Sequence, residues 1–340
     1  MAATIYDVAK KAGVSTATVS RVINKLGNVR QETKAKVEEA MEQLNFTPNA
    51  LAVSFATNKS NIIGLVTTLE SERNISNEMV NNFYFTELFR GINTVLKRRN
   101  YDLLIINESL DNTQYYDGLI QNKRIDGLVV STQLHNTAQF KKLVRQKLPL
   151  AYIGKIPNFN QGLSVYARYY KYTDEILGYL NDKGFERVLF ISYRQKQDLI
   201  KMWDQLKYDN HTKMDIEYLD LYEAHQNGGL VEKIKDIYQD GNYPRAIFTD
   251  ELNNVQIIIS VLNNLGLQVP KDVSIVSVEH IHGMGNNYYP KITNVYVPVY
   301  DMGVAVANLL IDFIEQNQQE YNKQIILESI LIERESVKKG

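Results

Sequence analysis

The sequence predicts an all-α helix-turn-helix headpiece followed by an α/β domain of two lobes. Two observations predict this fold class. Residues 4–55 hold three short amphipathic helical patterns and a short fourth segment before any strand-like run begins. From residue 62 onward, apolar strand-like runs alternate with helical patterns, and the alternation restarts near residue 176. Such alternation is typical of parallel sheets covered on both faces.

Composition limits the class of protein. With 340 residues the chain exceeds one ordinary domain, and its 44% hydrophobic and 23% charged residues are typical of a soluble globular protein. The absence of cysteine excludes a disulfide framework, a thiolate metal site and a cysteine nucleophile. No apolar run approaches the ~20 residues of a membrane helix, and no secretory segment opens the chain. We therefore expect no membrane partner and a cytoplasmic location.

Charge is distributed unevenly along the chain. Residues 1–60 hold eight Lys or Arg against five Asp or Glu, whereas the whole chain has a net charge of −1. A positive head on an acidic body suits a DNA-binding protein whose phosphate contacts are confined to one end. A mixed, solvated helix face would show similar numbers.

The first fifty residues predict the helices of the headpiece. Residues 5–12 place apolar side chains at helical spacing, Gly13 breaks the pattern, and Ser15 is a good N-cap for a second helix over 16–24. A third helix is predicted over residues 31–44. Two helices joined by a short turn with a glycine form a helix-turn-helix, whose second helix can lie in the major groove of DNA.

This segment resembles one protein family. The runs IYDVAKKAGVS, TATVSRVIN and VRQETKAKVEEAMEQLNFTPNALA resemble the headpiece of the LacI/GalR family of bacterial transcription regulators. The resemblance implies that Thr16 and Ala17 read bases, and that Arg21 contacts a base or a phosphate in the same groove. It also implies phosphate anchors, which are Tyr6, Ser15, Thr18, Ser20 and Asn24. Thr18 and Ser20 could equally be ordinary exposed polar residues.

The resemblance extends to the segment after the third helix. In the family this segment is a hinge helix that forms when two subunits pair over the minor groove of the operator. The matching DNA contacts here are Asn49, Ala52 and Phe55. The family's wedge between base pairs is a leucine, but phenylalanine is also an intercalating wedge, so we expect Phe55 to kink the operator. The alternative is that Phe55 is a linker residue that packs on the next domain.

The alternation of strands and helices predicts the elements of the two lobes. Apolar runs predict strands, and amphipathic runs predict the helices between them. The predicted strands are 62–66, 102–106, 125–130, 150–154, 188–191, 246–248 and 273–276, and the predicted helices are 85–98, 115–122, 138–146, 176–183 and 299–315. The polar residues 70–81 are predicted to form an insertion in a strand-to-helix loop.

Further runs resemble the family's effector domain. These are RIDGLVV, AIFTDE, LGLQVPKDVSIVSV and PKITNV, and they imply a two-lobed periplasmic-binding-protein-like (type I) fold in which the chain crosses between lobes three times. The predicted division is a headpiece (1–46), a hinge (47–60), a first lobe (61–156 plus 297–324) and a second lobe (157–296 plus 325–340). By the same resemblance, helix 299–315 returns to the first lobe. The terminal strand 325–333 would begin in the first lobe and finish in the second.

Side chains at fixed points between the lobes would bind the effector. Sugar-binding members of the family place Asp, Arg and Asn there, because sugar hydroxyls need charged partners in a dry pocket. The matching positions, together with aromatic side chains that could stack on a sugar, are Phe83, Tyr84, Arg168, Trp203, Thr249, Asp250 and Glu279. Arg168 stands where the family has an aspartate.

Two interpretations of this pocket stay open. The effector could be unusual, larger or charged, with sugar or sugar phosphate as the class that the family implies. Alternatively the pocket is degenerate and a partner protein exerts control. Arg168 could equally lie on the lobe surface among neighbouring tyrosines.

The overall prediction is a homodimeric, effector-responsive repressor of a carbohydrate-utilisation operon, bound to a near-palindromic double-stranded operator. No Gly-rich phosphate loop or nucleophile elbow is present, so we predict neither an enzyme nor a cofactor. His280 and His282 could supply at most two metal ligands, so no metal site is predicted. The rivals are a sugar-binding protein without a regulatory role and an enzyme on the same fold, and neither explains the headpiece.

Overall fold

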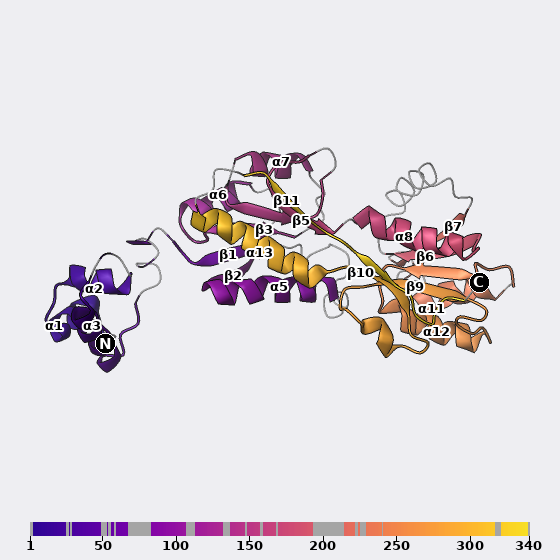
Figure 1. The fold of residues 1–340 in the computed structure, drawn as a ribbon, viewed down its shortest axis with the longest axis horizontal. Helices are drawn as coiled ribbons and strands as arrows, with labels where there is room; N and C mark the ends of the chain where they lie inside the picture. The colour runs from indigo at the N-terminus through magenta and orange to yellow at the C-terminus, as the bar shows by residue number, and fades with distance from the viewer. Residues whose placement is uncertain are drawn as a thin grey trace.

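The computed structural model describes most of the chain. The described residues are 3–24, 27, 29–48, 53, 56–57, 59–66, 83–106, 113–131, 137–146, 148–156, 159–167, 169–192, 214–221, 224, 229–239, 241–316 and 321–338. The predicted insertion at 70–81 lies outside them. Figure 1 shows a small helical headpiece, then a first lobe, then a second lobe along the longest axis of the molecule.

The headpiece consists of three helices, α1 (Ile5–Ala12), α2 (Thr16–Ile23) and α3 (Gln31–Gln43). A capping box starts α1, because Thr4 accepts from the Asp7 amide while the Asp7 carboxylate accepts from the Thr4 amide at 2.8 Å. Gly13 ends α1 with a φ of 67°, a left-handed conformation that glycine adopts without steric cost. These helices confirm the prediction to within one residue at each end.

The headpiece has its own small core. Its buried members are Val8, Ala9, Val19, Val22, Val37 and Ala40. They come from all three helices, and this cluster is separate from the cores of the lobes. The headpiece is therefore a packing unit of its own.

The first lobe is a parallel sheet with helices on both faces. The described strands run in the order β11 (Lys323–Leu327), β5 (Leu163–Ala167), β4 (Leu150–Ile153), β3 (Gly127–Val130), β1 (Ile62–Val66) and β2 (Asp102–Ile106). Its helices are α5 (Phe83–Arg99), α6 (Thr113–Gln121), α7 (Thr137–Arg145) and α13 (Val299–Gln316). Strands β1, β3 and β4 are continuous apolar runs, as expected for strands buried on both faces.

The second lobe repeats this architecture. Its described strands run in the order β12 (Ile330–Ile332), β10 (Thr293–Tyr296), β9 (Ser274–Glu279), β8 (Ala246–Thr249), β6 (Arg187–Ser192) and β7 (Asp215–Asp220). Strand β12 is antiparallel to β10, and the other pairs are parallel. The helical elements are α8 (Tyr169–Asp182), α11 (Gly229–Tyr238), α12 (Asn254–Asn264) and the short 3₁₀ helix η2 (Met284–Asn287).

Helices α5 and α13 are packed unusually closely in the first lobe. A Cβ atom added at Gly91 of α5 would lie 2.1 Å from the Tyr300 carbonyl oxygen, and one at Gly303 of α13 would lie 2.4 Å from the Leu88 carbonyl oxygen. The two backbones can approach this closely only because each helix has a glycine at the crossing. Arg99 adds ion pairs across the same helix pair, to Asp312 at 2.9 Å and Glu315 at 2.5 Å.

The predicted lobe boundaries need correction. Strand β5 pairs with β4, and β11 pairs with β5, so residues 163–167 and 323–327 belong to the first sheet. The prediction from sequence assigns 157–167 and 325–327 to the second lobe. Its other statement is confirmed: helix α13 packs against α5, β3, β4 and β5 of the first lobe, and the terminal segment contributes β11 to the first sheet and β12 to the second.

Other elements also differ from prediction: β5, β7, β10, α11 and α12 are not among the predicted strands and helices, and two predicted elements have clearly different bounds. Helix α8 begins at Tyr169, seven residues before the predicted start, and β9 continues to Glu279 rather than ending at Val276. On the edge strand β2, Leu104 and Ile105 are 38% and 44% exposed whereas Ile106 is buried, so this strand is covered only in part. Within the described ranges, none of the helices is both long enough and apolar enough to span a membrane.

Candidate DNA-binding helix and effector site

Helix α2 is held in place by the turn that precedes it. Ser15 caps the helix, because its hydroxyl accepts from the Thr18 amide at 3.2 Å, and the two hydroxyls lie 3.0 Å apart. On the inner side of α2, Val19 and Val22 are buried in the headpiece core. Because this side of α2 packs in the core, the opposite side of the helix faces solvent.

The outer face of α2 carries the predicted base-reading residues. Ala17 and Arg21 are exposed and lie one turn apart, and Thr16 is partly exposed beside them. Tyr6 of α1 is 74% exposed. An exposed helix face with an apolar contact, a hydroxyl and a guanidinium can enter a major groove and contact base edges there.

Some of the predicted phosphate anchors have local partners. The Asn24 amide donates to the Ser20 hydroxyl at 3.1 Å, four residues earlier, and the Thr18 and Ser15 hydroxyls bond each other. These contacts fix the side chains at both ends of α2. The Ser20 hydroxyl keeps its own proton and could still donate to a phosphate.

The predicted hinge is described at a few positions. Val53, Ala56 and Thr57 have helical conformation, and the Thr57 hydroxyl donates to the Val53 carbonyl at 2.8 Å, four residues earlier. The predicted contacts Asn49, Ala52 and Phe55 lie outside the described residues.

An ordered anchor joins the hinge to the first lobe. The Asp126 carboxylate accepts from the Ser60 amide at 2.7 Å, from the Ser60 hydroxyl at 2.9 Å and from the Asn61 amide at 2.8 Å. Asp126 lies just before β3, so the chain enters β1 from a fixed point on the edge of the sheet.

The two sheets direct polar residues toward the lobe junction. In the second sheet β9, β8 and β6 are parallel neighbours, so their carboxyl ends lie on one edge. Ser192, Asp250 and His280 lie at these ends, and the Ser192 hydroxyl donates to the Asp250 carboxylate at 2.5 Å. Thr249 is buried, and its hydroxyl bonds the backbone of Glu251. Ligands of open α/β sheets bind outside such carboxyl ends.

Tyr84 meets this edge from the first lobe. It lies in the first turn of α5, and its ring packs edge-on against the ring of His280, with centroids 5.5 Å apart and an interplanar angle of 86°. Burial raises the pKa of Tyr84 to about 12, and a hydrogen bond with Ser131 at the end of β3 opposes this rise. Tyr84 therefore stays a neutral hydroxyl at physiological pH. Phe83, beside it, is partly exposed.

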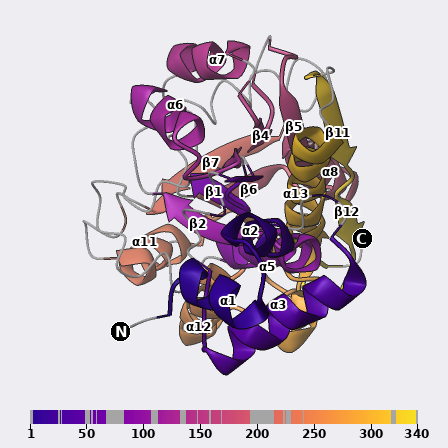
Figure 2. The same cartoon turned by 90° about the vertical axis from the view of Figure 1, so that its left-hand side faces the viewer.

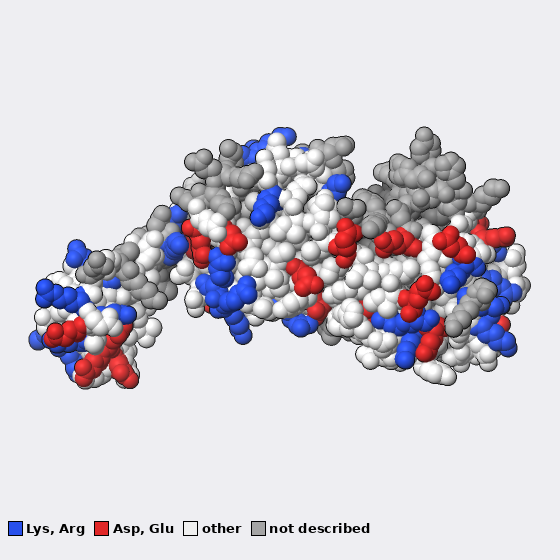
Figure 3. Space-filling view, in the orientation of Figure 1, with Lys and Arg blue, Asp and Glu red and all other residues white. Residues whose placement is uncertain are grey.

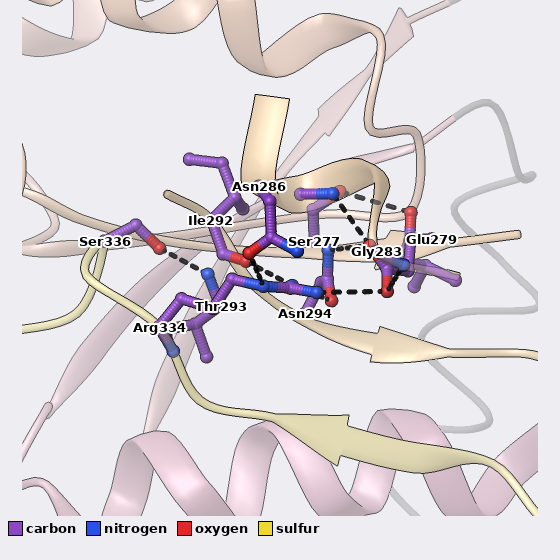
Figure 4. Close-up of polar contacts among 11 residues, drawn as sticks. Ser277, Glu279, Gly283, Asn286, Ile292, Thr293, Asn294, Arg334 and Ser336 are labelled. Carbon is purple, nitrogen blue, oxygen red and sulfur yellow. Dashed lines mark hydrogen bonds and ion pairs between the residues drawn. The ribbon is translucent and has the colours of Figure 1, made fainter. Parts of the chain in front are cut away.

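Glu279, a predicted effector residue, is instead part of a buried network (Figure 4). Its carboxylate accepts from the Gly283 amide at 3.0 Å, the Gly285 amide at 2.8 Å and the Asn294 side chain at 2.9 Å. It also pairs with Arg334 at 3.3 Å, and both side chains are almost completely buried. The carboxylate is thus fully used in holding the loop after β9 to the C-terminal segment.

His280 directly follows β9, and its contact with Tyr84 places it at the lobe junction, although it is not among the effector residues predicted from sequence. The contact joins segments that are far apart in the chain, so no local pattern in the sequence indicates it. The next histidine, His282, packs edge-on against Tyr296 of β10, with centroids 5.0 Å apart. The described residues contain no cluster of three His, Cys, Asp or Glu that could hold a metal.

The predicted effector residues are therefore only partly brought together. Tyr84 and Asp250 lie on the facing edges of the two sheets, whereas Arg168 and Trp203 lie outside the described residues. A surface cavity of about 390 Å³ lies elsewhere, on the second lobe between α12 and η2, and is lined by Gln256, Ile259, Met284, Asn287, Tyr288 and Tyr289. It contains none of the predicted effector residues.

The headpiece and the two-lobed domain together define a DNA-binding transcriptional regulator. Residues 4–49 match the profile described as bacterial regulatory proteins of the lacI family, and residues 177–337 match a periplasmic binding protein-like domain. The regulator RegA of Clostridium saccharobutylicum is 30% identical over 99% of each chain. The chain belongs to the LacI family of bacterial regulatory proteins.

Other relatives agree with this assignment. The chain is 29% identical to the repressor PurR of Histophilus somni, over 99% of each chain, and 26% identical to catabolite control protein A of Priestia megaterium, over 96% of each chain. Its fold matches a Lac repressor dimer bound to operator and the anti-inducer ONPF, with a TM-score of 0.78, 18% identity and 99% of each chain covered. The names of RegA, PurR and the Lac repressor describe transcriptional regulators or repressors.

Proposed function

We propose that this regulator is a homodimeric repressor of carbohydrate-utilisation genes that binds a near-palindromic operator and responds to a small effector. The observation that carries the DNA-binding part is the geometry of α2. Its inner face builds the headpiece core, and its outer face presents Ala17 and Arg21 to solvent. In a dimer, two such helices would occupy half-sites, and the hinge segments over 47–60 would lie at the centre, with Phe55 as the wedge.

The test begins with an operator selected from a random duplex library, followed by gel shifts over a range of salt concentrations. Arg21→Ala is expected to lower affinity for the selected operator by about 1–3 kcal/mol, a factor of roughly 5–150, and to relax preference at one base pair of each half-site. Lys36→Ala is the matched control, because Lys36 is an exposed cation of α3 that pairs with Glu32. No sequence preference in the wild-type protein would refute the proposal.

For the effector, we propose that the ligand binds between the facing sheet edges, in contact with Tyr84, Asp250 and His280 and with Arg168. Sugar or sugar phosphate is the proposed class, supported by a fold that also matches a regulator CelR–cellobiose complex with a TM-score of 0.64 and 21% identity. Glu279 is omitted because its carboxylate is already used. Ligand binding would shift the population between two lobe arrangements.

Thermal-shift screening of sugars and sugar phosphates tests this proposal. A ligand that stabilises the wild type is expected to lose its effect with His280→Ala or Arg168→Ala and to keep it with His282→Ala, whose ring packs on Tyr296. Deleting residues 1–58 should abolish DNA binding and leave this ligand response unchanged. If no ligand binds while operator binding is intact, a degenerate pocket controlled by a partner protein is the better interpretation.

A further inference from the structure

The edge of the first lobe that faces the headpiece carries exposed basic side chains. In a parallel α/β sheet the amino ends of the strands and the carboxyl ends of the preceding helices lie on the same edge. Here Asn61 and Asp102 are joined by a backbone hydrogen bond of 2.8 Å, as are Ile62 and Asp126. The exposed cations next to these positions are Lys59, Lys97, Arg98 and Arg124. We call these four residues the basic edge.

The position of the basic edge follows from the hinge anchor. Asp126 fixes Ser60 and Asn61, so the headpiece is tethered to this edge and not to any other part of the lobe. Figure 1 shows the headpiece beyond this end of the first lobe, and Figure 2, which looks from that side, shows α2 in front of α5. Figure 3 shows blue side chains gathered over the end of α5 that lies nearest the headpiece. Any duplex held by the headpiece would lie on this side of the lobe.

Among the residues that the structure describes, neither Lys97 nor Arg98 takes part in an ion pair, in contrast to Arg99. Arg99 completes the α5–α13 packing through Asp312 and Glu315. Arg98, one residue earlier, instead donates to the neutral amide of Asn308 at 3.4 Å. Lys97 is exposed beside it. The exposed Asp102 offsets one charge of the edge, and the Asp126 carboxylate is occupied by the hinge anchor.

We propose that the basic edge is a second DNA-contacting surface, which binds operator phosphates near the hinge once the headpieces are seated. This inference rests on the proposed function, and it adds a partner for the lobe itself. Lysine and arginine side chains neutralise phosphates without reading sequence, and they act over a Debye length of about 8 Å at physiological salt. The alternative role of Lys97 and Arg98 is to complement the dipole of α5, in whose last turn they lie.

The test compares operator affinity across salt concentrations for the full-length protein. Lys97→Gln/Arg98→Gln is expected to weaken operator binding about three- to tenfold at low salt. The slope of log K against the logarithm of the salt concentration should also become less negative, by about 0.9 for each phosphate that the variant no longer neutralises. The matched control is Lys233→Gln/Lys271→Gln, which removes the same charge from α11 and from the segment before β9 in the second lobe.

The outcomes separate the possibilities. A flattened slope in the edge variant but not in the control supports the proposal. Equal slopes in wild type, edge variant and control overturn it and leave only the dipole role, which would appear as a lowered unfolding midpoint. If the edge variant fails to fold, Arg124→Gln gives the same comparison from the α6 side of the edge. A wild type without sequence-selective binding refutes the proposed function itself, before the edge is tested.

Discussion

Helix α5 runs from the proposed effector site to the basic edge, and its close contact with α13 gives a sharp stability prediction. The helix begins at Phe83 beside the lobe junction and ends at Arg99 beside the hinge anchor, and Gly91 lies at its middle. In a Gly91→Ala variant, the new methyl group would lie 2.1 Å from the Tyr300 carbonyl oxygen and 3.0 Å from the Val304 amide nitrogen. Both obstacles are backbone atoms and cannot rotate away.

The magnitude follows from this geometry. Ordinary contact begins at 3.4 Å, so α5 and α13 would have to separate by about 1.3 Å along their crossing. Overpacking typically costs about 1–3 kcal/mol, and a rigid backbone obstacle places this case at the upper end. Alanine recovers about 1 kcal/mol of helix propensity, so we expect a net loss near 2 kcal/mol in the free energy of unfolding.

Urea unfolding followed by circular dichroism measures this loss. Gly118→Ala in the middle of α6 is the matched control, because its nearest neighbour, the Asn122 amide nitrogen, would be 3.9 Å from the new methyl group. That variant is expected to gain about 0.5–1 kcal/mol. Equal unfolding free energies for the two alanine variants, with unchanged m-values, would refute the packing argument.

Three further predictions concern the networks around the sites. Arg334→Met should destabilise the second lobe by about 3–5 kcal/mol in thermal or urea unfolding, because it leaves the buried Glu279 carboxylate without its cation, whereas Arg334→Lys should recover part of the loss. Asp126→Ala should speed amide hydrogen exchange at Ser60 and loosen the hinge attachment, and unchanged exchange would contradict the anchor. Hydrogen bonds from Thr4 lower the pKa of the Asp7 carboxyl, so the stabilisation of α1 should be present above the unfolded pKa and be lost as pH falls through the folded pKa. An NMR titration of the Asp7 carboxyl tests this, with Thr4→Ala as the variant in which the pKa returns toward its ordinary value.

The headpiece could be predicted almost completely from sequence because its signals are local. Gly13 needs a left-handed conformation, Ser15 caps the next helix, and the apolar spacing has a single consistent face. The buried strands of the lobes are predictable for a similar reason, since a short continuous apolar run between two helices is typical of a strand buried on both faces.

The features that sequence could not predict depend on distant partners. Nothing local in the apolar run Leu163–Ala167 says which sheet it joins, and the answer comes from its pairing with β4 and β11. The start of α8 is rich in tyrosine, a composition that suggests an interface more than a helix. For this reason the sequence does not predict its first seven residues as helical. Glu279 is predicted to bind the effector because it matches a pocket position of the family. Its true partner, Arg334, lies 55 residues away, so the pairing is invisible to sequence spacing.

The terminal segment has a consequence for how the chain is made. Strand β11 completes one edge of the first sheet, β12 completes one edge of the second, and only two residues separate them. Neither lobe can be finished until residues 323–332 have left the ribosome, whereas the headpiece core is complete within the first 46. During synthesis the DNA-binding unit should therefore be folded long before the domain that restrains it, so a nascent or truncated chain would present a headpiece with no lobes to control it.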